Sequence, residues 1–327
     1  MKKYEAFTAY AFTPLGGTDK AHGNPALVVF GDKSLTEKEK FLISRQARVE
    51  LNDEMIELPI ITFIEPVDVE KNNFNIQYYF CSGMEVSICG HGTLCATKVI
   101  LEKYKKKNEK QSFTFNLNQS FEENRVFPQL KIESDGTHFT AEFDDVDFTP
   151  LAKDSKVYEI IQKNLPNIVD NTVYISSLKD YICVCSNAET LRKTIIPLTE
   201  LRKIREIDET YRCVIAVSPS NIKGYDYETT VFSDGLPAPV YKDPACGSAN
   251  KEMPKLLRIT NTFPNRFKSG DTEHFRMFYP YRYAETGIMG GIQEVEYRYK
   301  ENKIFVTCGV KFGKGSEITI DGDKIIF

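Results

Sequence analysis

Two short segments of the chain carry a cysteine, then a glycine, then a small polar residue or histidine. They are Cys89-Gly90-His91-Gly92 and Cys246-Gly247-Ser248-Ala249, which lie 157 positions apart in a chain of 327 residues. Each comes just before a helical pattern, at residues 93–104 and 249–257. The start of a helix directs backbone N–H groups and a positive dipole end at the preceding loop. Such a place binds carboxylates and lowers the pKa of a thiol, so both loops predict proton or anion chemistry.

The segments before the two loops are also similar. Phe80-Cys81-Ser82-Gly83 precedes the first loop, and Phe232-Ser233-Asp234-Gly235 precedes the second. Each follows an apolar or alternating stretch that predicts a strand, at residues 75–80 and 229–232. Two similar halves, each with one Cys-Gly helix start, predict a cleft in which two anion-binding loops face each other.

A third candidate is the polar cluster at residues 52–54, which ends in Glu54. A carboxylate acts as a general acid and base when burial raises its pKa toward the working pH. Leu51, Met55 and Ile56 are apolar neighbours that could provide this burial. The alternative is a solvated carboxylate, because three more acidic residues lie within four positions of Glu54.

Four more polar residues could contribute to a site. A neutral His91 can relay a proton or donate to a carboxylate, and Asp243 can orient it or bind a substrate hydroxyl or amine. Ser248 can bind substrate or simply cap its helix. Asn24, after a glycine-rich loop, can bind substrate or serve as a turn residue. Zinc binding by Cys89, His91 and Cys95 is the weaker interpretation, because no fourth ligand occurs at a recognisable spacing.

The pattern along the chain predicts an α+β protein with mixed sheets wrapped on helices. We expect helices to begin at Thr36, where Glu39 completes a capping box, and at Ser155. A further helix is expected at residues 198–204. The expected strands cover residues 4–10, 26–30, 60–64, 75–80, 112–116, 129–133, 137–143, 172–176, 181–185, 213–217 and 227–232. The last part, residues 295–320, is expected to be a meander with glycine turns.

Composition limits the partners. The chain has 42 basic and 46 acidic residues and a net charge of −4, which gives no electrostatic case for nucleic acid or anionic membrane. No export signal or membrane span is recognisable, so eight cysteines predict reduced thiols in the cytoplasm. No phosphate-binding loop, dinucleotide fingerprint or Gly-x-Ser-x-Gly motif occurs. We therefore expect no nucleotide or flavin cofactor and no metal.

Taken in order and spacing, these motifs resemble the phenazine-biosynthesis PhzF-like family over nearly the whole chain. The resemblance rests on Gly23-Asn24-Pro25, on the Asn-Asp-Glu at 52–54, on residues 89–93, on residues 243–249 and on Cys308-Gly309-Val310. It implies the diaminopimelate-epimerase fold: two pseudo-symmetric domains, each a sheet curled round a central helix. We expect one domain at residues 1–125, joined by 310–327, and the other at residues 126–309.

The resemblance also implies a function. It implies a cofactor-independent isomerase, which acts on a small carboxylate-bearing metabolite and forms a homodimer. Glu54 matches the family's acid/base glutamate, and His91, Asp243 and Ser248 match its other site residues. Contacts to substrate are expected from Asn24, from the backbone of Gly90, Gly92 and Gly247, and from Cys89 and Cys246.

Two alternatives remain. In the related proline racemases and diaminopimelate epimerases, two cysteines at the corresponding loop positions form a thiol/thiolate pair. Both are present here, as Cys89 and Cys246, so a two-thiol racemase or epimerase is the first alternative. The second is a relative that binds a ligand or partner without turnover. Phe80-Cys81-Ser82, where the family usually has Phe-Thr-Pro, is a departure that bears on the substrate pocket.

Overall fold

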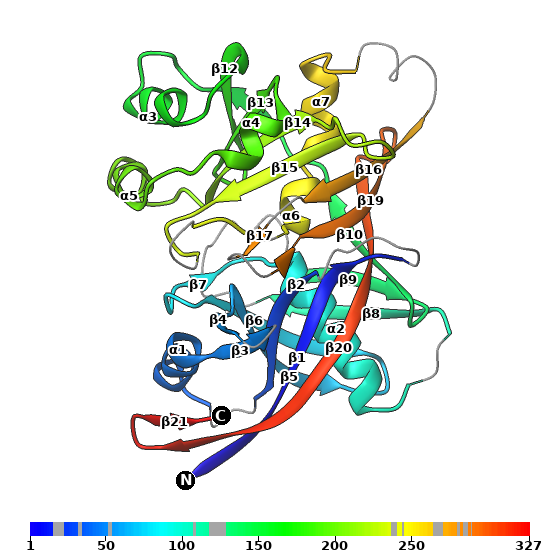
Figure 1. The fold of residues 1–327 in the computed structure, drawn as a ribbon. Coiled ribbons are helices and arrows are strands. Elements are labelled where there is room, and N and C mark those ends of the chain that lie inside the picture. The colour runs from blue at the N-terminus through cyan, green and yellow to red at the C-terminus, as the bar shows by residue number, and fades with distance from the viewer. Residues whose placement is uncertain are drawn as a thin grey trace. The chain divides into compact units, whose positions relative to one another are not determined.

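The structure, a computed structural model, is shown in Figure 1. It describes residues 1–15, 23–31, 35–51, 54–106, 109–117, 129–236, 241–243, 245–263, 271–279, 282–283, 287–288 and 290–327. The chain divides into two compact units. Unit 1 comprises residues 1–142, 283–289 and 307–327, and unit 2 comprises residues 143–282 and 290–306. The long strand β20 passes from unit 2 into unit 1 at residue 307.

Unit 1 contains a closed barrel. Within the described residues, each strand pairs with the next in the order β1, β2, β5, β6, β8, β9, β10 and β20, and β20 pairs again with β1. The strands are β1 (Lys2–Thr13), β2 (Asn24–Phe30), β5 (Ile60–Asp68), β6 (Asn73–Phe80), β8 (Gln111–Leu117), β9 (Gln129–Ser134), β10 (His138–Asp144) and β20 (Lys303–Asp321).

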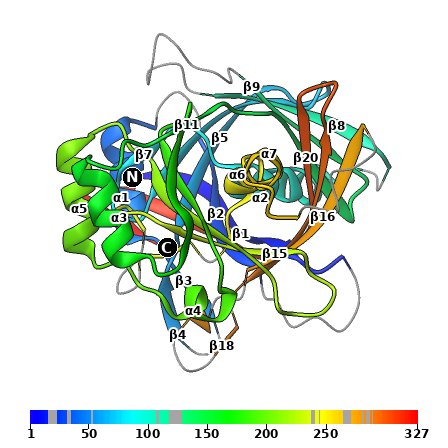
Figure 2. The same ribbon diagram turned by 90° about the horizontal axis from the view of Figure 1, so that it is seen from above.

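Helix α2 (Gly90–Lys103) fills the barrel. It contacts β1, β2, β5 and β9, and all its residues from Gly90 to Thr97 are buried. A helix that is apolar on all sides needs such an enclosure, because no face of it is suited to water. Figure 2 shows the strands of unit 1 curving round α2. The helix begins at Gly90, three residues before the helical pattern expected at residues 93–104.

Smaller elements of the chain lie outside the barrel. Helix α1 (Glu37–Gln46) has Thr36 as its N-cap and the full capping box with Glu39, which confirms the prediction. Several short strands form pairings of their own or with the barrel. They are β3 (Arg48–Leu51) with β4 (Glu54–Glu57), β7 (Glu85–Val86) with β6, β21 (Lys324–Ile326) with β20, and β17 (Arg282–Tyr283) with β18 (Gly287–Ile288).

Unit 2 is a mixed sheet covered by helices. Strands pair in the order β11 (Phe148–Pro150), β12 (Ile168–Ser176), β13 (Asp180–Cys185), β14 (Cys213–Pro219), β15 (Tyr227–Phe232), β16 (Thr272–Tyr279) and β19 (Gly291–Arg298). A buried apolar cluster joins this sheet to α3 (Lys156–Asn164), which starts at Ser155 as predicted, and to α5 (Leu198–Ile207). Helix α4 (Ala188–Lys193) contacts β14 and β15.

The prediction of one continuous helix at residues 249–257 is wrong, because the helix is interrupted. The structure has two short helices there, α6 (Gly247–Asn250) and α7 (Met253–Ile259). Pro254 lies in the first turn of α7. Proline lacks an N–H, and its ring would clash with the carbonyl of residue 250 in a continuous helix, so the helix must restart.

The meander expected at residues 295–320 is confirmed only in its first part, where β19 pairs with β20. The glycine turn expected in its second part is wrong. Residues 303–321 form one strand, β20, which pairs along β1 from Lys2↔Ile320 to Thr13↔Gly309. The glycines in it allow close approach instead of turning the chain. A Cβ on Gly309 would meet the Thr13 carbonyl oxygen at 2.7 Å.

Candidate functional site

The first candidate loop is fixed by bonds at the start of α2. Cys89 is the N-cap, and its Sγ accepts the N–H of Gly92 at 3.3 Å. The Thr93 hydroxyl donates to the Cys89 carbonyl at 2.8 Å. Because that hydroxyl has one proton, Tyr78 must donate to Thr93 Oγ1, at 2.6 Å. The sulfur therefore lies at the positive end of a fourteen-residue helix.

Gly92 is required by this packing. A Cβ at this position would meet Thr62 Oγ1 at 2.4 Å and Tyr78 Cδ1 at 3.1 Å. Both neighbours belong to barrel strands, so the helix start lies against the wall with no room for a methyl group. The second glycine of the motif is therefore needed because the helix backbone lies directly against the side chains of the barrel wall, as the sequence predicts.

His91 and Asn24 lie together in unit 1. His91 is 3% exposed, and its Nε2 lies 2.8 Å from the backbone carbonyl of Asn24, which is fully buried at the start of β2. A carbonyl only accepts, so Nε2 carries the ring proton and Nδ1 remains an acceptor. Burial lowers the pKa of His91 to about 3, although the carbonyls of Asn24 and Pro25 act in the opposite direction. The imidazole is therefore neutral at physiological pH.

The shifted pKa predicts acid sensitivity. Unfolded His91 takes up a proton below pH 6.5, whereas the folded ring resists until about pH 3. At pH 7 the ring is mostly neutral in both the folded and the unfolded state, so it hardly affects the free energy of unfolding. As the pH falls from 6.5 toward 3, the unfolded state gains a proton that the folded state does not, and the free energy of unfolding declines by roughly 3–5 kcal/mol in all. Urea unfolding of His91→Asn should show a flatter decline. His274→Asn, which changes a histidine whose side chain is 71% exposed, is the control and should follow the wild type.

Two further thiols are buried near Cys89. Burial raises the pKa of Cys95 well above its ordinary value, and Cys308 and Cys89 act in the same direction. Burial likewise raises the pKa of Cys308 to about 12. These are neutral core thiols. Among the described residues, no group of three or more Cys, His, Asp and Glu side chains is arranged to hold a metal ion.

Glu54 opens strand β4 and pairs with Leu51 of β3. Glu54 therefore belongs to an antiparallel pair of short strands, and the other two residues of the polar cluster, Asn52 and Asp53, lie outside the described residues. Only the backbone of Glu54 is described, so the burial of its carboxylate stays a prediction.

The second candidate loop leads into α6. Cys246 is the N-cap, and its Sγ lies 3.4 Å from Ser248 Oγ. Burial raises the pKa of Cys246 to about 12, and the charge of Asp243 adds to this, while Ser248 and Arg212 oppose it. Asp243 Oδ1 accepts the N–H of Ala245 at 3.2 Å, which folds the loop back on itself. Pro244 lies outside the described residues.

The sequence interpretation missed two residues that hold this loop. The Asn250 amide donates to the Cys246 carbonyl at 3.1 Å and to Gln293 Oε1 at 2.7 Å. The Gln293 amide donates to the same carbonyl at 3.4 Å. Asn250 stands four residues after Cys246, a spacing that brings it over the loop and could have been noticed. Gln293 comes from β19 and has no local signal.

Comparison with known proteins decides the family. The sequence profile described as "Phenazine biosynthesis-like protein" (PhzC-PhzF) matches residues 5–306. The chain belongs to this phenazine biosynthesis-like family. A search among curated proteins finds no matching sequence.

Solved structures of phenazine biosynthesis proteins and of a probable proline racemase share the fold. A Bacillus anthracis phenazine biosynthesis protein of the PhzF family has a TM-score of 0.69 at 17% identity, covering 98% of this chain and 100% of its own. An Enterococcus faecalis member has a TM-score of 0.64 at 20% identity, with 98% and 100% covered. A probable proline racemase from Agrobacterium radiobacter has a TM-score of 0.57 at 12% identity, with 97% and 93% covered. These confirm the fold predicted from the sequence.

In this family member, the predicted site residues form two groups. Asn24, Cys89, Gly90, His91 and Gly92 lie together in unit 1. In unit 2 the second group consists of Asp243, Cys246, Gly247 and Ser248. The convergence of both groups with Glu54 in one cleft stays a prediction.

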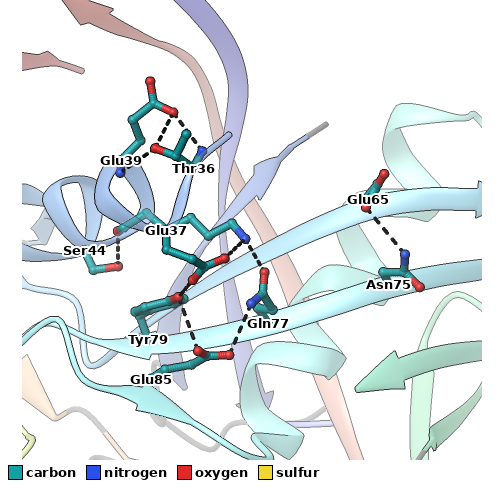
Figure 3. Close-up of polar contacts among 10 residues, drawn as sticks. Thr36, Glu37, Glu39, Ser44, Glu65, Asn75, Gln77, Tyr79 and Glu85 are labelled. Atoms are coloured by element: carbon teal, nitrogen blue, oxygen red, sulfur yellow. Dashed lines mark hydrogen bonds and ion pairs between the residues drawn. The ribbon is translucent and has the colours of Figure 1, made fainter. Parts of the chain in front are cut away.

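A separate cavity of about 620 Å³ lies in unit 1, between α1 and strands β5, β6 and β8. None of the predicted site residues lines it. Figure 3 shows its polar wall. The Tyr79 hydroxyl donates to Glu37, Lys40 binds Glu37 and Gln77, and the Gln77 amide donates to Glu85 at 3.2 Å. Because these groups bond to one another, they fasten α1 to the barrel, and we assign the cavity no part in the reaction.

Proposed function

We propose that this chain is a cofactor-independent isomerase. It removes a proton from one carbon of a small carboxylate-bearing metabolite and returns a proton to another, or to the opposite face, so that no oxidant is needed. Membership of the phenazine biosynthesis-like family over residues 5–306 is the observation that carries the proposal. In it Glu54 is the general acid and base, as the sequence resemblance implies.

The described geometry supports roles for the other residues. The neutral His91 ring, with Nε2 donating to Asn24, has Nδ1 available as an acceptor for a substrate proton. The buried start of α2 suits a substrate carboxylate approached by the backbone of Gly90 and Gly92. Asp243, Gly247 and Ser248 would contact the substrate from the second loop. The same resemblance underlies the proposal of a homodimer, and the eight cysteines, expected to be reduced thiols, underlie the proposal of a cytoplasmic location. None of the described helices is long and apolar enough to cross a membrane.

A two-thiol racemase or epimerase is the second candidate. The observation that favours it is that both Cys89 and Cys246 are N-caps of helices. This mechanism needs one thiol and one thiolate, placed on opposite faces of a carbon. Burial keeps Cys246 protonated, with its pKa raised to about 12, which suits it only for the thiol role.

Hydrogen exchange tests the proposal without a known substrate. Candidate amino acids and cyclic hydroxy acids are incubated with the protein in deuterated water, and we expect protein-dependent deuterium at a carbon atom of at least one. Matched incubations with the Ser248→Ala variant should show weaker exchange. Binding without any exchange, measured by calorimetry, would instead support a non-catalytic relative.

A further inference from the structure

Behind the Cys246 loop lies a group of buried polar side chains that the proposed reaction does not use. Lys251 and Glu252 directly follow α6, and both side chains are 0% exposed. Asp180, at the start of β13, is also 0% exposed, and Arg212, just before β14, is 14% exposed. Burying four ionisable groups costs free energy unless each is paired or neutral, so their arrangement calls for an explanation.

Asp180 is the anion of this group. Arg212 Nε donates to Asp180 Oδ1 at 2.8 Å, and a second guanidinium nitrogen bonds to Oδ2. The Cys213 thiol also donates to Oδ1, at 2.9 Å. Burial alone would raise the pKa of Asp180, but the charge and hydrogen bonds of Arg212 outweigh it and hold the pKa below the ordinary value.

The surroundings of Glu252 favour its protonated form. Among the described residues no donor reaches either of its carboxyl oxygens, and Lys251 Nζ stays 3.6 Å away while donating to the Ser248 carbonyl at 2.9 Å. The neighbouring carboxylate of Asp180 can bond to Glu252 only if Glu252 supplies the hydrogen. Burial, followed by the charge of Asp180, raises the pKa of Glu252 to about 8. Arg212 is the firm cation of the group, since Asp180 helps to raise its pKa well above the ordinary value. Burial lowers the pKa of Lys251, while the charges of Glu252 and Asp180 oppose that lowering and favour its ammonium form.

These charges act on Cys246. The charge of Arg212 opposes the burial that raises the thiol's pKa, and Lys251 interacts with the same sulfur. Asp243, Tyr279 and Cys213 also interact with this sulfur, and Asp243 disfavours the thiolate. Lys251 also reaches the loop directly through the Ser248 carbonyl, so one side chain links the charge network to the backbone of the motif.

We propose that Lys251 is a positioning residue for the second loop: its ammonium fixes the Ser248 carbonyl and, with Arg212, stabilises the thiolate of Cys246 as long as Glu252 holds its proton. The inference rests on the proposed function only in assigning Cys246 and Ser248 to the site. The charge of the network, and with it the reactivity of Cys246, then depends on the protonation of Glu252.

Alkylation of Cys246 by iodoacetamide, followed peptide by peptide with mass spectrometry, tests the charge effect without any substrate. We expect Lys251→Met to slow alkylation of Cys246 near neutral pH by about tenfold, equivalent to about one pKa unit. Lys251→Arg should restore much of the rate. Lys255→Met is the matched control, because Lys255 bonds to Asp147 at 3.0 Å instead of to the loop. Equal rates in the Lys251→Met and Lys255→Met proteins would overturn the proposal.

The Glu252→Gln variant gives a second test, which keeps the hydrogen bond from Lys251 to the Ser248 carbonyl. The amide keeps a donor for Asp180 but cannot ionise. In the wild type, loss of the Glu252 proton above about pH 8 adds a negative charge and should hold back the rise of the alkylation rate with pH. The variant should rise more steeply. Coincident pH profiles, with circular dichroism showing both proteins folded, would reject the inference. Absence of deuterium exchange would reject the proposed isomerase and leave this test intact.

Discussion

Glu54→Gln is expected to abolish exchange of substrate carbon-bound hydrogen with solvent, by a factor of about a hundred or more, while the protein stays folded. General acid and base catalysis commonly contributes a factor of this size or larger. The amide has nearly the shape of the carboxyl group but cannot accept and return a proton. Cys89→Ala and Cys246→Ala should each keep substantial activity. The measurement is deuterium incorporation under the conditions that give exchange with the wild type.

The matched control for this prediction is Glu57→Gln. Glu57 belongs to the same strand, β4, but bonds to Arg48 at 2.7 Å, so its loss should leave exchange near the wild-type rate. Exchange that persists in Glu54→Gln and needs both cysteines would replace the proposal with the two-thiol racemase. Thiol alkylation cannot decide this by itself, because added bulk at Cys89 blocks the loop sterically.

Gly92→Ala should lower the free energy of unfolding by about 1–3 kcal/mol, the usual cost of overpacking a tight core. The new methyl would meet Thr62 Oγ1 at 2.4 Å and the Tyr78 ring at 3.1 Å, so α2 must shift out of its place in the barrel. Because Cys89 and His91 stand on the same helix start, exchange activity should fall as well. Urea unfolding measures the first effect.

A double variant separates the steric cause from others. Thr62 Oγ1 is buried and has no hydrogen-bond partner among the described residues, so Thr62→Ala alone should be nearly neutral. Combined with Gly92→Ala it should recover much of the lost stability. Gly31→Ala is the control, since its methyl would meet the end of the Leu35 side chain at 3.2 Å and the Ile64 carbonyl oxygen at an ordinary contact distance of 3.9 Å. A double variant no more stable than Gly92→Ala would show that the clash with Thr62 is not the cause.

Local signals in the sequence predicted the features that depend on a few neighbouring residues. The capping box at Thr36, the helix start at Ser155 and the placing of Cys89 before α2 follow from hydrogen bonds that span three or four positions. The break at Pro254 is also local, and it could have been predicted from the missing N–H of proline.

The site could be predicted only in part, because its motifs name the residues and not their surroundings. The resemblance singled out His91, but its neutrality follows from burial inside the barrel and from the carbonyl of Asn24, 67 positions away. The motif around Cys246 gave no sign of Gln293, which reaches the loop from 47 positions further along the chain. These contacts arise only when the strands pair.

Tertiary structure alone decided what the glycines and the buried charges do. Gly309 resembles a turn residue in the sequence, yet it lies inside the long strand β20, which pairs closely with β1, about 300 positions away. Lys251 and Glu252 resemble an exposed, charged pair near a helix end. They are buried because Asp180 and Arg212 come from β13 and the start of β14 to meet them. No periodicity or motif encodes such a meeting, since its free energy depends on which distant groups share one low-dielectric space.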